Sequence, residues 1–259
     1  MGTVINHEFN EGSVSDVEIA KIGQFAESRY FGKPCGLLDQ TASSVGSFVA
    51  VDFNDPQKPV VNKIPFDFTS SGYSLCIVDT GGNHADLTDD YAAVPKEMKE
   101  VAAHFNKEVL RDVDKNEFFA SIGALRGKVS DRALLRAIHF FNEDERAVNA
   151  AKALQNNDFD LFKDIIIASG RSSFMYLQNV FTCKNPEEQG LSLALCLSEE
   201  ILNGKGAYRV HGGGFAGTVQ AFVPNGLLSE YKSKIEAVFG DGCCYVFNIR
   251  PVGGIRVSE

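Results

Sequence analysis

Two short stretches combine glycine with groups that could take part in catalysis or binding: a carboxylate in the first, and successive backbone amides in the second. The first, GKPCGLLDQTASSVGS at residues 32–47, places Gly36 three residues before Asp39. A carboxylate in this position could act as a general base for a substrate hydroxyl, and the glycine would let a small polar substrate approach the main chain. Asp39 could instead cap a helix formed by the residues that follow it. The spacing alone favours the capping role.

The second stretch is HGGGFAG at residues 211–217, between two predicted strands. Its glycines can adopt positive φ, and successive exposed amides in such a loop form a nest for an anion. A flexible hairpin connection is the alternative, but about two residues suffice for that. Three adjacent glycines also cost chain entropy, so the pattern slightly favours an anion site at Gly212, Gly213 and Gly214. No lysine follows, so the loop is not a P-loop.

A third stretch, GGNHADLTDDY at residues 81–91, is typical of a solvated loop and ends in Tyr91. This ring could cover an edge of the core or stack on a substrate ring. The six cysteines include no C-x-x-C pair, and no two of the five histidines have helical ligand spacing. The sequence therefore predicts no metal site of its own, and it predicts reduced thiols.

The elements that must position these stretches follow from periodicity and turn residues. We expect Ser15 or Asp16 to cap the first helix, with Glu18 three residues after Ser15, and Pro186 to lie in the first turn of a later helix. The order of elements predicts an α+β fold, with an antiparallel sheet and helices on one side of it. The predicted strands are 48–53, 58–68, 73–81, 207–210, 218–224 and 243–250. The predicted helices are 16–30, 89–106, 132–158 (as one helix or two), 159–178, 185–201 and 227–240. Pro95, inside the second of these, is compatible with a helix start near Val94 or with a kink.

The composition excludes several classes of protein. The 259 residues are 44% hydrophobic and 23% charged, which is ordinary for a globular chain. The net charge of −9 disfavours nucleic acid and anionic membranes as partners. Apolar runs such as LSLALCL are too short to span a bilayer, and the first residues lack the pattern of a secretory signal. We therefore expect a cytoplasmic protein.

Taken together, the three stretches resemble a known family. FGKPCGLLDQTASSVG is similar to the galactokinase segment G-x-x-x-G-[IL]-[ML]-D-Q, and YRVHGGGFAGTVQAFVP resembles motif III of the GHMP kinases. The resemblance covers nearly the whole chain and corresponds to the C-terminal portion of a galactokinase. It implies a GHMP-kinase-like fold. Residues 1–70 would be the remaining part of the N-terminal domain, and residues 71–259 would be the C-terminal domain.

The resemblance implies phosphoryl transfer from ATP to the anomeric hydroxyl of galactose, with Mg²⁺. By motif matching, Asp39 is the catalytic acid–base residue, and Gly36 and Tyr91 fall where the family contacts the sugar. Gly212, Gly213 and Gly214 fall in the loop that supports the phosphates. His211 and Ala216 replace the more usual Thr and Gly of motif III.

Two galactokinase motifs do not occur in the sequence: G-E-H-x-D-Y with its arginine, and the phosphate loop P-x-x-x-G-L-S-S-S. We therefore expect the polypeptide to be inactive alone, and to require a missing N-terminal segment supplied in trans. An alternative is a non-catalytic sugar-binding or interaction module, or a truncated remnant. Unpaired strand edges in the N-terminal hairpin also predict self-association.

Overall fold

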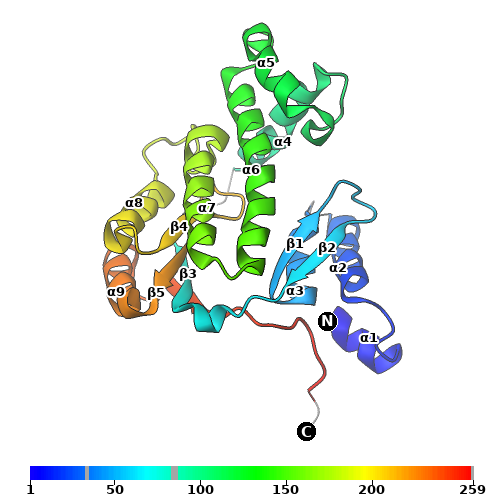
Figure 1. Cartoon of the computed structure of the whole chain (residues 1–259), viewed down its shortest axis with the longest axis vertical. Helices are drawn as coiled ribbons and strands as arrows, with labels where there is room; N and C mark the ends of the chain where they lie inside the picture. The colour runs from blue at the N-terminus through cyan, green and yellow to red at the C-terminus, as the bar shows by residue number, and fades with distance from the viewer. Residues whose placement is uncertain (33–34, 83–86, 258–259) are drawn as a thin grey trace. The chain divides into compact units, whose positions relative to one another are not determined.

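The computed structural model describes residues 1–32, 35–82 and 87–257 (Figure 1). The chain forms two compact units. The first unit contains Met1–Ser71, Leu154–Asn157 and the segment from Asn248 onward, and the second contains Gly72–Ala153 and Asp158–Phe247.

In the first unit, helices precede a two-stranded antiparallel sheet. Strands β1 (Phe48–Asp52) and β2 (Val60–Ile64) pair along their whole length. The Ser15 hydroxyl accepts a hydrogen bond from the Glu18 amide, so Ser15, and not Asp16, is the cap. The other elements of this unit are α1 (Gly2–Phe9), α2 (Asp16–Phe25), the π-helical turn η1 (Ala26–Tyr30), α3 (Leu38–Val45) and the 3-10 turn η2 (Phe68–Ser71).

The C-terminal segment packs against the end of α3. Gly46 ends this helix with a φ of +71°, and a Cβ there would overlap the backbone of Val252. The amide of Ser47 donates to the carbonyl of Arg250 over 2.6 Å. A Cβ at Gly253 would likewise overlap the backbone of Ser44. Two glycines thus allow the backbones of distant segments to touch.

The second unit is built on a four-stranded antiparallel sheet in the order β4-β5-β3-β6. Its strands are β3 (Tyr73–Asp79), β4 (Ala207–His211), β5 (Thr218–Pro224) and β6 (Cys244–Phe247). Its helices are α4 (Thr88–Ala103), α5 (Lys115–Leu125), α6 (Asp131–Gln155, which ends in the first unit), α7 (Phe159–Ser172), α8 (Gly190–Leu202) and α9 (Leu228–Phe239), with short turns η3 (Leu110–Asp112), η4 (Ser173–Leu177, π-helical) and η5 (Asn225–Leu227).

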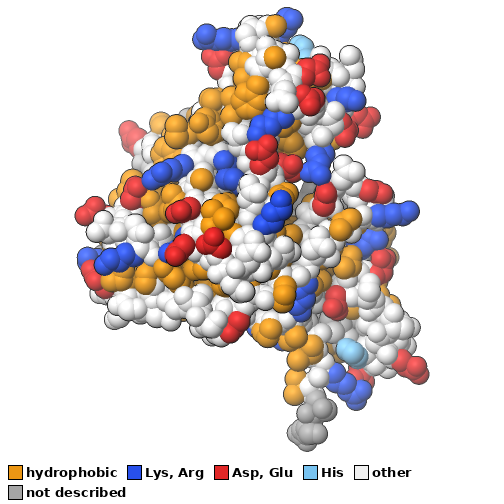
Figure 2. All heavy atoms as spheres, viewed as in Figure 1, with side chains coloured by type: hydrophobic (Ala, Val, Ile, Leu, Met, Phe, Trp, Pro, Cys, Tyr) orange, Lys and Arg blue, Asp and Glu red, His pale blue; other side chains and the backbone are white. Residues whose placement is uncertain are grey.

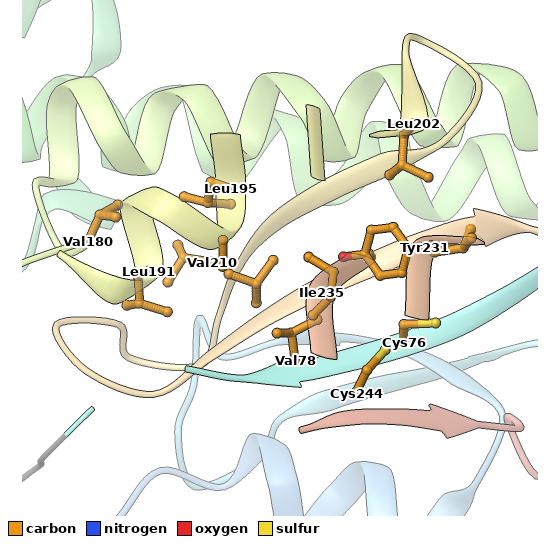
Figure 3. Packing of buried hydrophobic residues seen from close by; sticks show 14 residues of the cluster. Cys76, Val78, Val180, Leu191, Leu195, Leu202, Val210, Tyr231, Ile235 and Cys244 are labelled. Atoms are coloured by element: carbon orange, nitrogen blue, oxygen red, sulfur yellow. The ribbon is translucent and has the colours of Figure 1, made fainter. Parts of the chain in front are cut away.

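Helices α8 and α9 cover one face of this sheet. Figure 3 shows Leu191 and Leu195 of α8 and Ile235 of α9 packed against Val78 and Val210 of the strands. All five side chains are buried. This cluster is the main apolar core of the unit.

Helix α7 packs on the opposite face. Successive strand residues point to opposite faces, so Phe222 points away from its neighbours Ala221 and Val223 in the main core. Its ring meets those of Phe159 and Phe162 at centroid distances of 5.9 and 5.4 Å. The α+β class is confirmed, and the helices lie on both faces of the sheet where the sequence predicted one.

Three details differ from the sequence prediction. The helix expected from residue 185 begins at Gly190, so Pro186 precedes it. Helix α4 begins at Thr88 and continues through Pro95. Helices α1 and α5 were not predicted: the 8 residues of α1 are too few to establish a period, and the apolar residues of α5 do not form a clear helical stripe.

The surface carries mixed charge. On the face seen in Figure 2, acidic and basic side chains are interspersed, so the net negative charge does not gather there in one patch. Within the described residues, no helix is both long and apolar enough to cross a membrane.

Candidate functional site

Asp39 lies inside the first turn of α3 and does not cap it. The N-cap residue is Leu37, and no side chain caps this end of the helix. The capping role that the spacing favoured is therefore wrong. The helix is instead fixed by Thr41, which is fully buried and donates its hydroxyl to the Leu37 carbonyl over 2.8 Å. The Asp39 side chain is exposed at the positive end of the helix dipole, where a carboxylate is favourable.

The turn before Asp39 is held by polar side chains of the first unit. Gln24 donates its amide to the Cys35 carbonyl over 3.1 Å. Gln40, the residue after Asp39, donates to Glu27 over 3.0 Å. Gly36 is exposed, and a Cβ there would meet nothing within 4 Å. No described residue therefore blocks the Cβ position of Gly36, and its contact with a substrate stays a prediction.

The glycine-rich loop lies in the second unit, between β4 and β5. At its base, the His211 Nδ1 and the Thr218 hydroxyl are 3.0 Å apart and share a hydrogen bond. Thr80, at the end of β3, donates both its amide and its hydroxyl to the Gly217 carbonyl, over 3.1 and 2.8 Å. The loop is therefore tied to two neighbouring strands.

The structure gives a different reason for glycine at each of the three adjacent positions. A Cβ at Gly213 would come within 2.6 Å of Cε1 of Tyr91. Gly214 has a φ of +79°, and a Cβ there would overlap the carbonyl oxygen of Asn179. Gly212 has a φ of +66°, and a Cβ there would meet nothing within 4 Å. Gly213 and Gly214 are thus required by close packing, while no described residue occupies the Cβ position at Gly212.

Tyr91, in the first helical turns of α4, supports this loop from one side. Its hydroxyl donates to the Gly214 carbonyl over 2.8 Å, and its ring meets Phe215 edge-on at 5.3 Å between centroids. Desolvation, aided by the nearby charge of Asp90, raises the pKa of the Tyr91 phenol above its usual value of 10. The neutral, hydrogen-bond-donating form is therefore favoured.

Asn179 supports the loop from another side, and the sequence did not single it out. This residue is 3% exposed. Its side-chain amide donates to the Gly213 carbonyl over 3.0 Å, and its own carbonyl accepts from the Phe215 amide over 2.5 Å. An asparagine in the segment LQNV has no local pattern that marks it, because its partners lie more than thirty residues away in the chain.

The structure thus brings Tyr91 together with Gly213 and Gly214 in the second unit, and Gly36 together with Asp39 in the first. A loop of this kind can present backbone amides to an anion, and an exposed carboxylate can orient or accept a proton. In the described parts of the chain, no three His, Cys, Asp or Glu side chains are placed to hold a metal ion. Of the third stretch, residues 83–86 lie outside the described residues.

Comparison with known proteins gives a consistent result. The chain is 29% identical over 218 residues to a galactokinase of Actinobacillus pleuropneumoniae serotype 5b, covering 84% of this chain and 54% of that protein. It is 28% identical over 242 residues to a Streptomyces coelicolor galactokinase, covering 92% of this chain and 60% of the relative. The chain therefore spans little more than half the length of these curated relatives. No family model matches the sequence.

Solved structures show the same fold. Lactococcus lactis galactokinase, in a complex with galactose, superimposes with a TM-score of 0.71 at 21% identity, covering 99% of this chain and 64% of that one. The mevalonate kinase of L. major, in a complex with R-mevalonate, superimposes with a TM-score of 0.55 at 17% identity, covering 95% of this chain and 62% of that one. The resemblance predicted from the two motifs is therefore confirmed: the chain is homologous to galactokinases and has the GHMP kinase fold.

Proposed function

We propose that this chain takes part in galactokinase-type phosphoryl transfer, from ATP to the anomeric hydroxyl of galactose. Asp39 is the acid–base residue, and Gly36 lies beside the sugar. The glycine-rich loop supports the phosphates through Gly212, Gly213 and Gly214. The observation that carries the proposal is the presence of both the GLLDQ segment and the HGGGFAG loop in a chain homologous to galactokinases over most of its length.

The exposure of Asp39 supports its role, because a carboxylate that accepts a hydroxyl proton must be reachable by the substrate. The open main chain at Gly36, three residues earlier, supports the approach of a sugar at the same turn. Tyr91 was predicted to contact substrate. Its hydroxyl donates a hydrogen bond to the Gly214 carbonyl, so the ring lies beside the glycine-rich loop. If the ring contacts the substrate, it does so next to this loop.

We place ATP at the loop near Gly212, where the backbone has a positive φ and no described residue occupies the Cβ position. When bound, the nucleotide supplies the phosphoryl group. Magnesium commonly takes most of its ligands from substrate phosphates and water, and few from the protein. No residue here is assigned to the metal. Phosphoryl transfer depends mainly on positioning and charge neutralisation, which galactokinases draw in part from motifs that this sequence lacks. We therefore expect little turnover by the chain alone.

The test is a coupled assay with ATP, Mg²⁺ and galactose, run on the chain alone and with the part of a curated galactokinase that has no counterpart in it. We expect activity only in the mixture, and loss of at least about a hundredfold on Asp39→Asn. Equal activity of the variant would refute the role of Asp39. If neither the chain alone nor the mixture is active, and calorimetry shows no binding of galactose or ATP, the alternative of a truncated, non-catalytic remnant would be favoured instead.

Gly36→Ala tests the proposed sugar contact with little effect on folding. An added methyl meets no neighbour, so stability should change by less than about 0.5 kcal/mol. If galactose lies against this turn, the KM for galactose should rise while that for ATP stays unchanged. A variant with wild-type KM for galactose would remove Gly36 from the proposed site.

A further inference from the structure

The contact between Asn179 and the glycine-rich loop is strained on both sides. Phe215 in the loop has a φ of +62°, and Gln178 beside Asn179 has a φ of +56°. Non-glycine residues seldom adopt this left-handed region, and such strain persists only where surrounding structure holds it. Some other part of the second unit must therefore fix the turn at residues 178–179.

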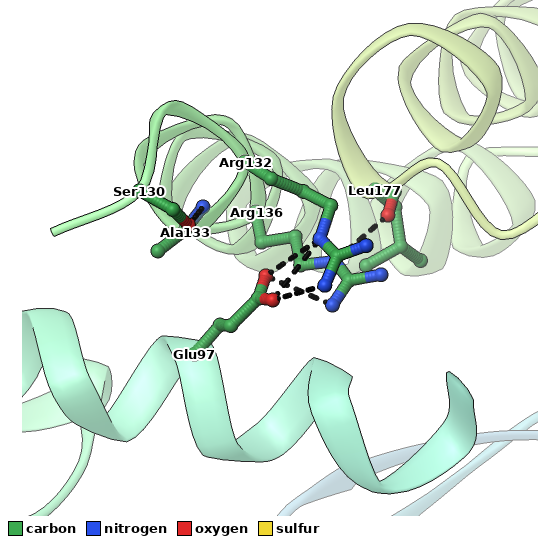
Figure 4. Close-up of polar contacts among 6 residues, drawn as sticks. All are labelled: Glu97, Ser130, Arg132, Ala133, Arg136 and Leu177. Atoms are coloured by element: carbon green, nitrogen blue, oxygen red, sulfur yellow. Dashed lines mark hydrogen bonds and ion pairs between the residues drawn. The ribbon is translucent and has the colours of Figure 1, made fainter. Parts of the chain in front are cut away.

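Arg136 of α6 supplies that support. Its Nε donates to the carbonyl of Leu177, the last residue of the π-helical turn η4, over 3.1 Å (Figure 4). The side chain is 2% exposed. A carbonyl at the end of a helix has no partner within the helix, so this bond holds the chain at the residue before the left-handed turn.

The position of Arg136 is fixed in turn by Glu97 of α4. The Glu97 carboxylate accepts from Nη1 of Arg136 over 2.9 Å and from Nη2 of Arg132 over 2.5 Å (Figure 4). Because the guanidinium is planar, using one edge for Glu97 fixes the direction of the Nε–H bond toward Leu177. Helix α4 also carries Tyr91, so a single helix anchors two supports of the loop.

We infer that Asn179 is a positioning residue for the glycine-rich loop, and that Arg136 acts through Leu177 to keep Asn179 in place. Asn179 binds the loop at the Gly213 carbonyl and at the Phe215 amide, on either side of Gly214. These two hydrogen bonds fix the backbone conformation of residues 213–215, and therefore the position of the neighbouring Gly212. The consequence for nucleotide affinity rests on the proposed function, whereas the effect on loop order does not.

The loop arm of the test measures the hydrogen-exchange protection factor of the Phe215 amide by NMR. Asn179→Asp keeps the side-chain shape but replaces the donor to the Gly213 carbonyl with a carboxylate. We expect protection at neutral pH to fall about tenfold, as for loss of a buried hydrogen bond. It should recover on acidification, when the carboxyl is protonated and can donate again. A cavity or a packing defect would not give this pH dependence.

A second pair of variants tests the role of Arg136. Arg136→Lys cannot reach both Glu97 and the Leu177 carbonyl with a rigid fork, so Phe215 protection should fall by a similar factor. Arg132→Lys is the control. Arg132 also binds the Glu97 carboxylate, but among the described hydrogen bonds it has none to Leu177, so the Phe215 amide should stay protected in this variant. Wild-type protection in both Asn179→Asp and Arg136→Lys would overturn the inference. If Arg136→Lys does not fold, Asn179→Asp decides alone.

The nucleotide arm compares the calorimetric Kd for Mg–ATP in the wild-type chain and in Asn179→Asp at neutral pH. We expect affinity to weaken by about the factor seen in exchange. Unchanged affinity beside a loosened loop would overturn the functional part of the inference. A wild-type chain that binds no nucleotide would count against the proposed function, while the exchange experiment would still decide whether Asn179 positions the loop.

Discussion

The hydroxyl of Tyr91 donates a hydrogen bond to the carbonyl oxygen of Gly214 over 2.8 Å. The same ring lies where any side chain at Gly213 would collide with it. One tyrosine therefore explains two features of the glycine-rich loop, its path and part of its composition. In the structure Tyr91 supports the main chain of the loop, and its contact with a substrate stays a prediction.

Tyr91→Phe tests the value of this bond. The ring and its edge-on contact with Phe215 stay, and only the donor is lost, leaving the Gly214 carbonyl without that partner. The free energy of unfolding should fall by about 1 kcal/mol. Urea denaturation followed by circular dichroism would measure it. A variant as stable as the wild type would show that water replaces the hydroxyl at no cost.

The raised pKa of Tyr91 predicts a pH dependence at the alkaline end. Burial raises the pKa above its usual value of 10 in the folded state. The resulting stabilisation is complete below about pH 10, where the unfolded phenol titrates, and is lost as pH rises through the folded pKa. The tyrosinate absorbance of wild type minus Tyr91→Phe should therefore show a phenol titrating later than an ordinary tyrosine. A difference titration at the ordinary pKa would contradict this.

The buried cluster around Glu97 should be essential for stability. Glu97→Gln removes the charge that faces Arg136, whose side chain is 2% exposed, so an uncompensated buried cation remains. We expect a loss of about 3–5 kcal/mol in the free energy of unfolding. Asp89→Asn, on the same helix, breaks an exposed ion pair with Lys184 and should cost less than about 1 kcal/mol. Similar losses in the two variants would contradict the difference in burial.

Glu143 of α6 should make the second unit sensitive to acid. Burial disfavours its charge, but hydrogen bonds from Ser169 and Arg146, with the charge of Arg209, lower the pKa below its usual 4.5. This stabilisation is present above the unfolded pKa and is lost as pH falls through the folded pKa. Glu143→Gln should cost about 2 kcal/mol at neutral pH.

The measurement that checks this is a pair of denaturation series across acidic pH. The difference between wild type and Glu143→Gln should shrink as the pH falls below about 4.5, because the native carboxylate becomes protonated. A difference that stays constant with pH would mean that the variant acts through packing and not through charge.

Gly46→Ala should release the C-terminal segment from the first unit. The new Cβ would overlap the backbone of Val252, and the φ of +71° is itself unfavourable for alanine. Limited proteolysis should cut the segment after residue 247 faster than in the wild type. Gly123→Ala is the control, since a Cβ in that helix meets nothing within 4 Å and should stabilise it slightly. Equal cleavage of the two variants would contradict the prediction.

Much of the fold could be predicted from the sequence because strands and long helices carry their pattern locally. The run YSLCIVDTG predicts a buried strand, and β3 is the strand between two others in the sheet. Ser15 and Glu18, three residues apart, form a local pattern that indicates the start of a helix. The position of α8 was less clear, since Pro186 suits a helix start and yet lies before it.

The candidate site was only partly predictable. The glycines of residues 212–214 were visible in the sequence, but their individual reasons were not. Gly213 depends on Tyr91, and Gly214 depends on Asn179, both remote in the chain. Asp39 was assigned to a cap because residue type and spacing do not reveal that the helix begins one residue earlier, at Leu38. Which catalytic role Asp39 plays stays a prediction, as does the division of the kinase domains at residue 70.

The return of the C-terminal segment to the first unit sets an order of events during synthesis. Gly46 is synthesised before its backbone neighbours Val252 and Gly253, which lie far from it along the chain. Every strand of the second unit lies between Gly46 and these residues in the chain. The first unit must wait for a closure that spans most of the polypeptide, with the slow search that such distant contacts impose. The first unit is thus completed only after all the strands of the second unit have been synthesised.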